Sequence, residues 1–344
     1  MLDGSVGEGT VLVQEGKEGK VYSDDGPGEV AGEAPSQWWP STIYALGDIH
    51  GDAMNTLLLL HAAGVVNSSA HWIAKDALLI QTGDIVDRGP DSRELYEYFM
   101  LLDTQARQQG GRLVQLLGNH EALNLCNVLV YVSPAEFETY GGAEQRALEF
   151  SERGEIGRKL RSLDSAVVYN DILFVHAGLL PKFAQLGLDA VNEGVRRELG
   201  AACSVEGSVF TGERGPLWDR VLATSAESRA CPLLDQTLAA VAAKRMVVGH
   251  TVTQSGRIEL RCDGKLVKID GGLSRYIMNR PVLLEIRAGD GWYQKWLEVN
   301  ATTRQPILHT QPLPISDGDT QAADDEQQRQ GSAGSDESTV IQLI

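Results

Sequence analysis

The chain has 344 residues and a formal net charge of −17. An acidic chain without a cluster of Lys and Arg binds nucleic acid poorly, because the phosphate backbone must be neutralised by cations. No apolar stretch is long enough to cross a membrane, and the N-terminus lacks the basic and apolar regions of a secretory signal. We therefore expect no nucleic-acid partner, no membrane and a cytoplasmic location; the sequence does not indicate the oligomeric state.

Both ends of the chain are acidic and poor in apolar residues. Residues 1–40 hold eight acidic residues against two lysines, and residues 306–344 hold seven against one arginine. Segments of this composition bury too little apolar surface to become ordered. We predict a disordered acidic arm over residues 1–40, a catalytic domain over residues 41–305 and a disordered acidic tail over residues 306–344.

Between these ends, strand-like and helix-like segments alternate. Short β-rich runs occupy residues 42–46, 77–81 and 112–117, and helical segments at residues 52–63 and 91–109 separate them. Such alternation predicts βαβ units on a parallel sheet. Residues 134–163 then resemble charged helices that could cover a site.

The second half of the chain adds further strands and hairpins. Strands are expected at residues 172–175 and 245–248, and helices at residues 181–200. Residues 257–269 and 282–299 each contain two strand-like runs around an Asp-Gly turn, which is a strong hairpin signal. We therefore predict an α/β fold with two facing mixed sheets flanked by helices, the second sheet being largely antiparallel.

Polar side chains follow several of the predicted strands, at the point where each strand ends. Because the carboxyl ends of neighbouring parallel strands open into one crevice, these side chains are expected to share one site. Asp, Asn and His without Cys suit divalent Mn, Fe or Zn rather than a closed thiolate zinc site. The predicted metal ligands are Asp48, His50, Asp84, Asn119, His176 and His250.

Two metal ions held close together need a shared anionic bridge, and Asp84 is the candidate. Asp48 and His50 would complete the ligands of the first ion. The second ion would take its remaining ligands from Asn119, His176 and His250. A hydroxide that bridges the two ions could attack phosphorus directly, so no protein nucleophile is needed.

Three further side chains have predicted roles in catalysis. Arg88 fits as a bidentate clamp on phosphate oxygens. His120 follows the predicted ligand Asn119 and is placed to protonate the leaving oxygen, while Asp87 could orient its imidazole. Each motif alone is more often a capped turn than a ligand loop, but four of the seven histidines lie in these motifs, which favours the joint functional interpretation.

The motifs together resemble those of a known family. Residues 83–89 match the Gly-Asp-x-Val-Asp-Arg-Gly motif of the phosphoprotein phosphatase branch of the metallophosphoesterase superfamily. Residues 116–124, 176–181 and 214–220 resemble the bacterial-type Shewanella-like protein phosphatases. The resemblance implies a β-sandwich, two divalent metals and hydrolysis of phosphotyrosine or phosphoserine/threonine in phosphoproteins.

The resemblance also implies a second phosphate-binding arginine. Arg220, two positions after Trp218, is similar to the arginine of a Trp-x-Arg motif and is preferred to Arg214. The Ser-Ala-Pro-Asn-Tyr loop of the eukaryotic serine/threonine phosphatases is absent, and residues 270–274 replace it. Two alternatives stay open: a dinucleoside polyphosphate hydrolase, and a phosphopeptide-binding pseudophosphatase.

The four cysteines, Cys126, Cys203, Cys231 and Cys262, are widely separated and form no Cys-x-x-Cys pair. Reduced thiols are more common than a disulfide framework in a chain of this size. We therefore expect free or buried thiols. The alternative left open is a disulfide between Cys203 and Cys231, which would require an oxidising compartment.

Overall fold

The computed structural model describes residues 38–200, 203–300, 303, 305–315 and 337–340. The chain divides into two units, Met1–Trp38 and Trp39–Ile344, and every helix and strand of the described residues belongs to the second. The predicted arm therefore lies almost wholly outside the described residues, as does most of the predicted tail.

The larger sheet has the strand order β12-β11-β10-β9-β1-β2-β3. Its strands β1, β2 and β3 are parallel, as the alternation of strands and helices predicted, and the next strand, β9, pairs antiparallel with β1. The strands are β1 (Thr42–Leu46), β2 (Leu78–Gln81), β3 (Arg112–Gln115), β9 (Val282–Arg287), β10 (Gly291–Val299), β11 (Pro306–Pro312) and β12 (Glu337–Val340).

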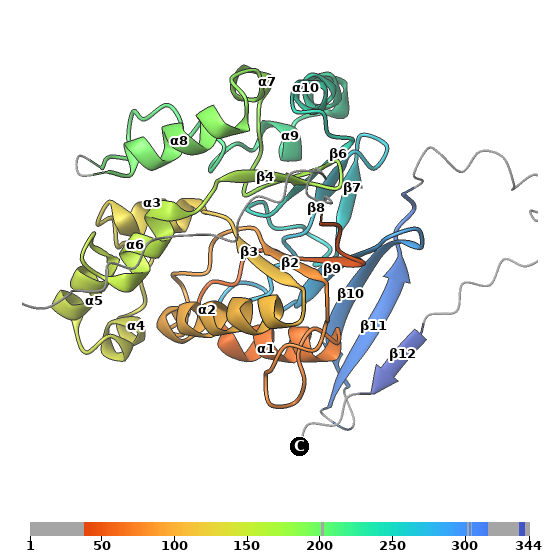
Figure 1. Ribbon diagram of the computed structural model, residues 1–344, viewed down its shortest axis with the longest axis horizontal. Helices are drawn as coiled ribbons and strands as arrows, with labels where there is room; N and C mark the ends of the chain where they lie inside the picture. The colour runs from red at the N-terminus through yellow and green to blue at the C-terminus, as the bar shows by residue number, and fades with distance from the viewer. Residues whose placement is uncertain (1–37, 201–202, 301–302, 304, 316–336, 341–344) are drawn as a thin grey trace, which may run out of the picture. The chain divides into compact units, whose positions relative to one another are not determined.

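The smaller sheet has the order β4-β5-β6-β8-β7. Its central strands β5, β6 and β8 are parallel, whereas β4 and β7 pair antiparallel at the edges. The strands are β4 (Ala166–Tyr169), β5 (Ile172–Val175), β6 (Arg245–Val248), β7 (Glu259–Arg261) and β8 (Leu266–Lys268). The two mixed sheets with flanking helices confirm the predicted fold class (Figure 1).

Two details of the prediction are wrong. The hairpin of β9 and β10 extends the larger sheet instead of joining the facing one, because β9 pairs with the free edge of β1. The predicted domain end at residue 305 is also too early. β11 runs beside β10 over seven residue pairs, and its Leu308 joins the core, so pairing and burial order a segment that composition assigned to the tail.

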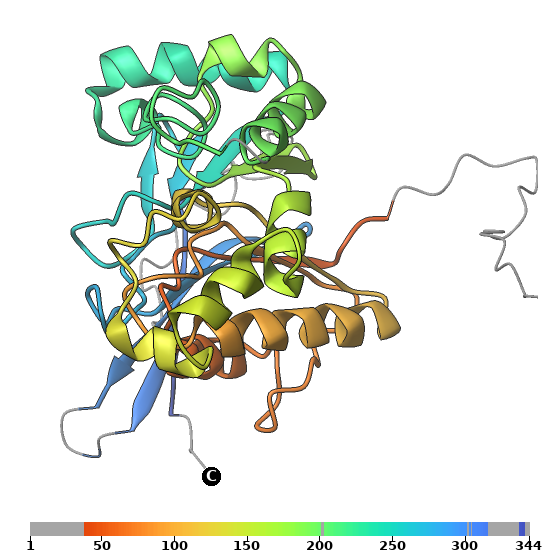
Figure 2. The same cartoon turned by 90° about the vertical axis from the view of Figure 1, so that its left-hand side faces the viewer.

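Helices cover the outer faces of both sheets (Figures 1 and 2). In α2, Leu95, Phe99, Leu102 and Ala106 follow helical spacing and are buried, so one apolar stripe packs on the core. No helix among the described residues is long and apolar enough to span a bilayer. The helices are α1 (Ala53–Ala62), α2 (Ser92–Gln108), α3 (Asn119–Leu125), α4 (Pro134–Thr139), α5 (Ala143–Phe150), α6 (Glu155–Ser162), α7 (Pro181–Ala184), α8 (Leu188–Glu198), α9 (Val221–Thr224) and α10 (Glu227–Ala240).

The expectation of reduced thiols is wrong as well. Cys126 forms a disulfide with Cys203, and Cys231 forms one with Cys262, with Cα atoms 5.1 and 5.4 Å apart. The partners are 77 and 31 residues apart in sequence, so only the tertiary fold brings them within bonding range.

Candidate active site

The predicted ligand loops converge where the two sheets meet. Loops that follow β1, β2 and β3 supply Asp48, Asp84 and Asn119 from the larger sheet. From the smaller sheet, β5 and β6 deliver His176 and His250. Hydrogen bonds tie the two sets together: His176 Nδ1 lies 2.9 Å from the carbonyl of Thr82, and the His250 amide donates to Asp48 Oδ1 over 3.0 Å.

The backbone of this site is strained at the residues that were predicted to act. Positive φ angles occur at His50 (47°), Asp84 (59°), Asp87 (71°), Arg88 (68°) and His250 (63°). Non-glycine residues adopt this region rarely, at a cost of order 1 to 3 kcal/mol each, and such strain clusters at functional sites. These turns orient several of the predicted site residues from short loops.

Two glycines allow the central loops to touch. A Cβ atom on Gly83 would lie 2.6 Å from the Cα of Gly118, and a Cβ on Gly118 would lie 2.2 Å from Asp84 Oδ1. Any side chain at either position would push the loop of Asp84 away from the loop of Asn119. These glycines therefore set the position of the predicted bridging carboxylate.

Asp84 occupies the centre of the arrangement. Its Oδ1 accepts a hydrogen bond of 2.9 Å from the amide of His120. Its Oδ2 lies 3.4 Å from His176 Nε2 and 3.9 Å from the Nε2 atoms of both His50 and His120. One carboxylate oxygen therefore faces imidazoles from both sheets.

The histidines direct their Nε2 atoms toward this centre. His50 Nδ1 donates to the carbonyl oxygen of Val86, which leaves its Nε2 as an acceptor. His176 Nδ1 lies 2.9 Å from the carbonyl oxygen of Thr82, so its Nε2 faces Asp84 Oδ2 and Asn119 Oδ1. His250 Nε2 is buried and has no hydrogen-bond partner in the described part of the chain. Buried acceptors that converge in this way repel one another unless a proton or a cation lies between them.

The donor set therefore fits divalent cations. Around Asp84, two groups of donor atoms are compact enough to hold an ion: His50 with Asp84 and His120, and Asp84 with His176 and His250. Asn119 Oδ1, 2.8 Å from His176 Nε2, adds a neutral oxygen to the second group. Asp48 Oδ2 adds a carboxylate oxygen 3.9 Å from His50 Nε2.

The pKa shifts follow from burial and mutual charge in the metal-free site. Burial lowers the pKa of His250 to about 2 and that of His50 to about 4. For His176, burial alone would lower the pKa, but the neighbouring Asp84 charge outweighs it and raises the pKa to about 10. Burial and the charge of Asp270 raise the pKa of Asp48 well above its ordinary value.

His120 and Asp87 form a separate pair beside the predicted ligands. His120 Nδ1 lies 2.5 Å from Asp87 Oδ2, so the ring nitrogen carries the hydrogen and the carboxylate accepts it. Burial alone would lower the pKa of His120, but the charges of Asp84 and Asp87 outweigh it and raise the pKa. The neighbouring charges thus favour the protonated imidazole, and its Nε2 faces Asp84.

Both predicted phosphate-binding arginines are exposed beside the site. The guanidinium of Arg88 stacks on the Tyr131 ring, 4.3 Å from its centre, and the Arg88 amide donates to the Tyr131 carbonyl. Arg220 Nη1 donates to the carbonyl of His250 and to Thr251 Oγ1, over 3.2 Å each. Arg220 is therefore anchored to the loop that carries His250.

Sequence reasoning gave no role to three buried residues. The Glu121 carboxylate accepts amide hydrogens from Asp84, Ile85 and Gly118 and so shapes the central loops. Asp270 is buried beside Gly47, and burial raises its pKa to about 6. Asn124 donates to Asp87; its position four residues after His120, on the same helical face, was the signal that could have revealed it.

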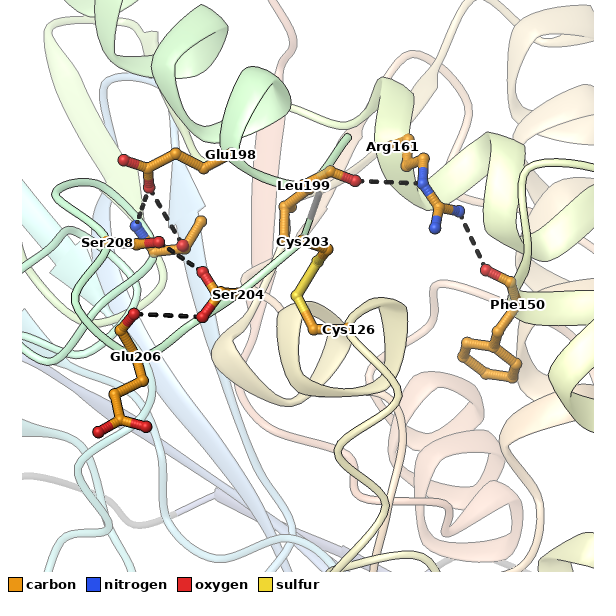
Figure 3. Close-up of a disulfide and its surroundings, with 10 residues drawn as sticks. Cys126, Phe150, Arg161, Glu198, Leu199, Cys203, Ser204, Glu206 and Ser208 are labelled. Carbon is orange, nitrogen blue, oxygen red and sulfur yellow. Dashed lines mark hydrogen bonds between the residues drawn. A yellow bond between two sulfur atoms is a disulfide. The ribbon is translucent and has the colours of Figure 1, made fainter. Parts of the chain in front are cut away.

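A groove of about 1000 Å³ extends from Arg220 and Trp218. Its apolar wall includes Leu123, Val128 and Val205. The disulfide of Cys126 and Cys203 lies in this wall, just after the end of α3, the helix that begins with Asn119 and His120 (Figure 3). Next to the lining residues Ser208 and Gly212, the Glu198 carboxylate accepts hydrogen bonds from the amides of residues 209, 210 and 211.

The chain matches the family model of the calcineurin-like phosphoesterases over residues 41–254. It belongs to the calcineurin-like phosphoesterase family. Hydrolysis of phosphoric esters is therefore its class of reaction, and the family is metal-dependent, in agreement with the converging Asp and His side chains.

Three comparisons describe where this phosphoesterase lies in its family. It is 32% identical to Shewanella-like protein phosphatase 1 of Plasmodium berghei over 69% of this chain and 68% of the relative. The crystal structure of a cold-active protein-tyrosine phosphatase of a psychrophilic Shewanella species is 26% identical, with a TM-score of 0.64 over 75% of this chain and 77% of that one. A symmetrical bis(5'-nucleosyl)-tetraphosphatase of Aromatoleum aromaticum is 31% identical over only 40% of this chain and 45% of the relative.

Proposed function

We propose that this phosphoesterase removes phosphate from phosphoproteins and uses two divalent ions, drawn from Mn, Fe and Zn. The observation that carries the proposal is Asp84, whose Oδ2 faces His50 Nε2 of the larger sheet at 3.9 Å and His176 Nε2 of the smaller sheet at 3.4 Å. Two bound ions would supply an activated water and Lewis-acid contacts to the phosphoryl oxygens. The ligands assigned to them are Asp48, His50, Asp84, Asn119, His176 and His250.

The remaining residues act on the substrate itself. Arg88 and Arg220, exposed at the site, bind phosphoryl oxygens and orient the phosphate for in-line displacement. His120 donates the proton on Nε2 to the leaving oxygen as the P–O bond breaks, and Asp87 stabilises the imidazolium before that transfer. Arg88 keeps its orientation by stacking on Tyr131.

Phosphoproteins are the substrate class that the groove and the relatives favour. Shewanella-like protein phosphatase 1 of Plasmodium berghei and the cold-active protein-tyrosine phosphatase match most of the chain, whereas the tetraphosphatase matches less than half. A polyphosphate chain would need several cations, yet the groove beside Arg220 contains Arg214 and Arg220 against Glu206 and Glu213. The pseudophosphatase alternative has less support, because the sequence retains every predicted ligand and the side chains of His50, Asp84, His176 and His250 lie close together.

The two disulfides argue against the cytoplasmic location expected from the sequence. Cytosolic thiols are kept reduced by glutathione and thioredoxin, whereas disulfides persist in oxidising compartments. Counting free thiols in protein that is trapped with an alkylating agent at cell lysis tests this point. Four alkylated cysteines would support the cytosol, and none would support an oxidising compartment.

The decisive experiment is hydrolysis by metal-loaded protein of matched peptides that carry phosphotyrosine, phosphoserine or phosphothreonine. Diadenosine tetraphosphate serves as the competing substrate. We expect phosphate release from a peptide, its loss with a chelator, and about two metal ions per chain by elemental analysis. Cleavage of the dinucleotide alone would overturn the substrate class, and one ion per chain would overturn the dinuclear site.

A further inference from the structure

A line of buried hydrogen bonds leads away from the His120 and Asp87 pair. Asn124 Nδ2 donates to Asp87 Oδ1 over 3.0 Å and to the carbonyl of His120 over 2.9 Å. On the other side of the amide, Arg146 Nη2 donates to Asn124 Oδ1 over 2.6 Å. Arg146 in turn forms an ion pair with Glu136 at 2.8 Å. The line thus joins α4 and α5 to the predicted proton donor.

The chemistry of these groups determines which of them donates and which accepts in each hydrogen bond of the line. A guanidinium can only donate hydrogen bonds, and a carboxylate can only accept them. Asn124 lies between the guanidinium of Arg146 and the carboxylate of Asp87; its oxygen faces Arg146 and its NH₂ group faces Asp87. Arg146 therefore fixes the orientation of the amide, and the amide fixes the carboxylate oxygen that His120 does not use.

These side chains are so deeply buried that their ion pair alone is expected to add little to the stability of the fold. Arg146 is 1% exposed, Glu136 0% and Asn124 3%. A buried ion pair contributes little net stability, since desolvation offsets the attraction, and apolar replacements of similar size are often as stable. Phe150 already packs against the Arg146 guanidinium at 4.3 Å, so an apolar contact is at hand. The guanidinium of Arg146 therefore acts on Asn124, through the hydrogen bond to Asn124 Oδ1.

We propose that Arg146 and Asn124 are positioning residues for proton donation in the phosphatase reaction. The proposal rests on the proposed function. Asp87 is held by His120 on one oxygen and by Asn124 on the other, so its carboxylate cannot rotate. In the step concerned, the P–O bond breaks, its electron pair goes to the leaving oxygen, and the His120 Nε2 proton bonds to that oxygen. A neutral imidazole remains.

The test compares two substrates of nearly equal shape. Phenyl phosphate has a poor leaving group that needs a proton, and 4-nitrophenyl phosphate has a good one that needs little help. The variants are Asn124→Ala, and Arg146→Met combined with Glu136→Gln so that no buried charge loses its partner. We expect kcat on phenyl phosphate to fall about tenfold or more, with KM unchanged, and kcat on 4-nitrophenyl phosphate to change less than about threefold.

Arg161 provides a matched control. It also bridges helices, because its guanidinium donates to the carbonyls of Phe150 and Leu199 (Figure 3). Within the described residues no hydrogen bond or ion pair links Arg161 to Asp87. Arg161→Met should lower stability without any dependence on the leaving group. In a His120→Asn background, the Asn124→Ala change should have no further effect on either substrate, because there is no proton donor left to position.

A second readout does not depend on turnover. The Nδ1 proton shared with Asp87 should give a far-downfield proton NMR signal in the metal-free protein, assigned by its absence in His120→Asn. Asn124→Ala should move or broaden this signal, whereas Arg161→Met should leave it in place.

Equal losses of kcat on both aryl phosphates, or no loss on either, together with an unmoved NMR signal, would overturn the proposal. If the Arg146 variant does not fold, Asn124→Ala alone decides. If the wild-type protein hydrolyses neither aryl phosphate, the NMR signal decides the positioning role by itself; the proposed function fails only if the phosphopeptides are not hydrolysed either.

Discussion

His120 Nδ1 and Asp87 Oδ2 lie 2.5 Å apart, in a pair whose carboxylate is fully buried. The contact comes from two different loops, one after β2 and one after β3, so it depends on their parallel pairing. Burial alone would lower the pKa of His120, but the charges of Asp84 and Asp87 outweigh it and raise the pKa, which favours the protonated imidazole. A protonated imidazole is the form that can donate a proton to a leaving oxygen.

His120→Asn should therefore lower kcat on a phosphoserine peptide by about 10²- to 10⁴-fold, the usual contribution of a general acid. Metal content, measured on the same preparation, should stay at the wild-type value, since Asp84 and His176 are untouched. Steady-state kinetics on the peptide check the first point. An unchanged kcat on this poor leaving group would remove His120 from the acid role.

Arg220→Ala should raise KM for phosphopeptides by about tenfold, because a charged hydrogen bond to phosphate is worth roughly 1.5 kcal/mol or more. Arg214→Ala is the matched control. Arg214 also lines the groove, but no bond ties it to the His250 loop in the described chain. Equal effects of the two changes would show that general charge in the groove, not the Arg220 position, binds phosphate.

Glu121→Gln should destabilise the fold and weaken metal binding. The Glu121 carboxylate accepts hydrogen bonds from the amides of Asp84, Ile85 and Gly118 and from the Tyr96 hydroxyl. The NH₂ group of a glutamine would face two of these donors, which should lower the free energy of unfolding by about 3 kcal/mol. Urea unfolding and metal titration check this, and wild-type values in both would contradict it.

Asp270→Asn should stabilise the metal-free protein at neutral pH. Burial raises the pKa of Asp270 from 3.8 to about 6, so its contribution to stability is complete below pH 3.8 and is lost as pH rises through 6. Asparagine can keep the bond from the Gly272 amide without the charge. We expect a gain on the order of 1 to 3 kcal/mol at pH 7 and none at pH 3.5, measured by urea unfolding.

Loss of the disulfide between Cys126 and Cys203, as Cys126→Ser with Cys203→Ser, should lower the free energy of unfolding by about 4 kcal/mol. The loop that it closes spans 77 residues, and the chain-entropy model assigns a cost of this size to opening it. Denaturant unfolding with and without reductant measures the effect. Reductant should then destabilise the wild type more than this variant, which retains only the bond of Cys231 and Cys262.

Local pattern was enough to locate many of the elements. Strand runs that end in Gly-Asp or Gly-Asn, separated by helical segments, correspond to β1, β2 and β3 with α1 and α2 between them. These elements can be predicted because ligand loops follow the ends of strands, and because the spacing of apolar residues along a helix or strand depends only on residues close in sequence. Such signals failed at α10, which contains Pro232, and at the short edge strand β4.

The sequence by itself determined the family motifs, the residue types of the site and its class of chemistry, since these are properties of short runs. Only the tertiary structure decided that β9 joins β1, that Cys126 meets Cys203, and that Arg146 reaches Asn124. Each of these contacts joins residues that are far apart in the chain or on different elements. Their proximity is set by how helices and sheets pack, which no local pattern encodes.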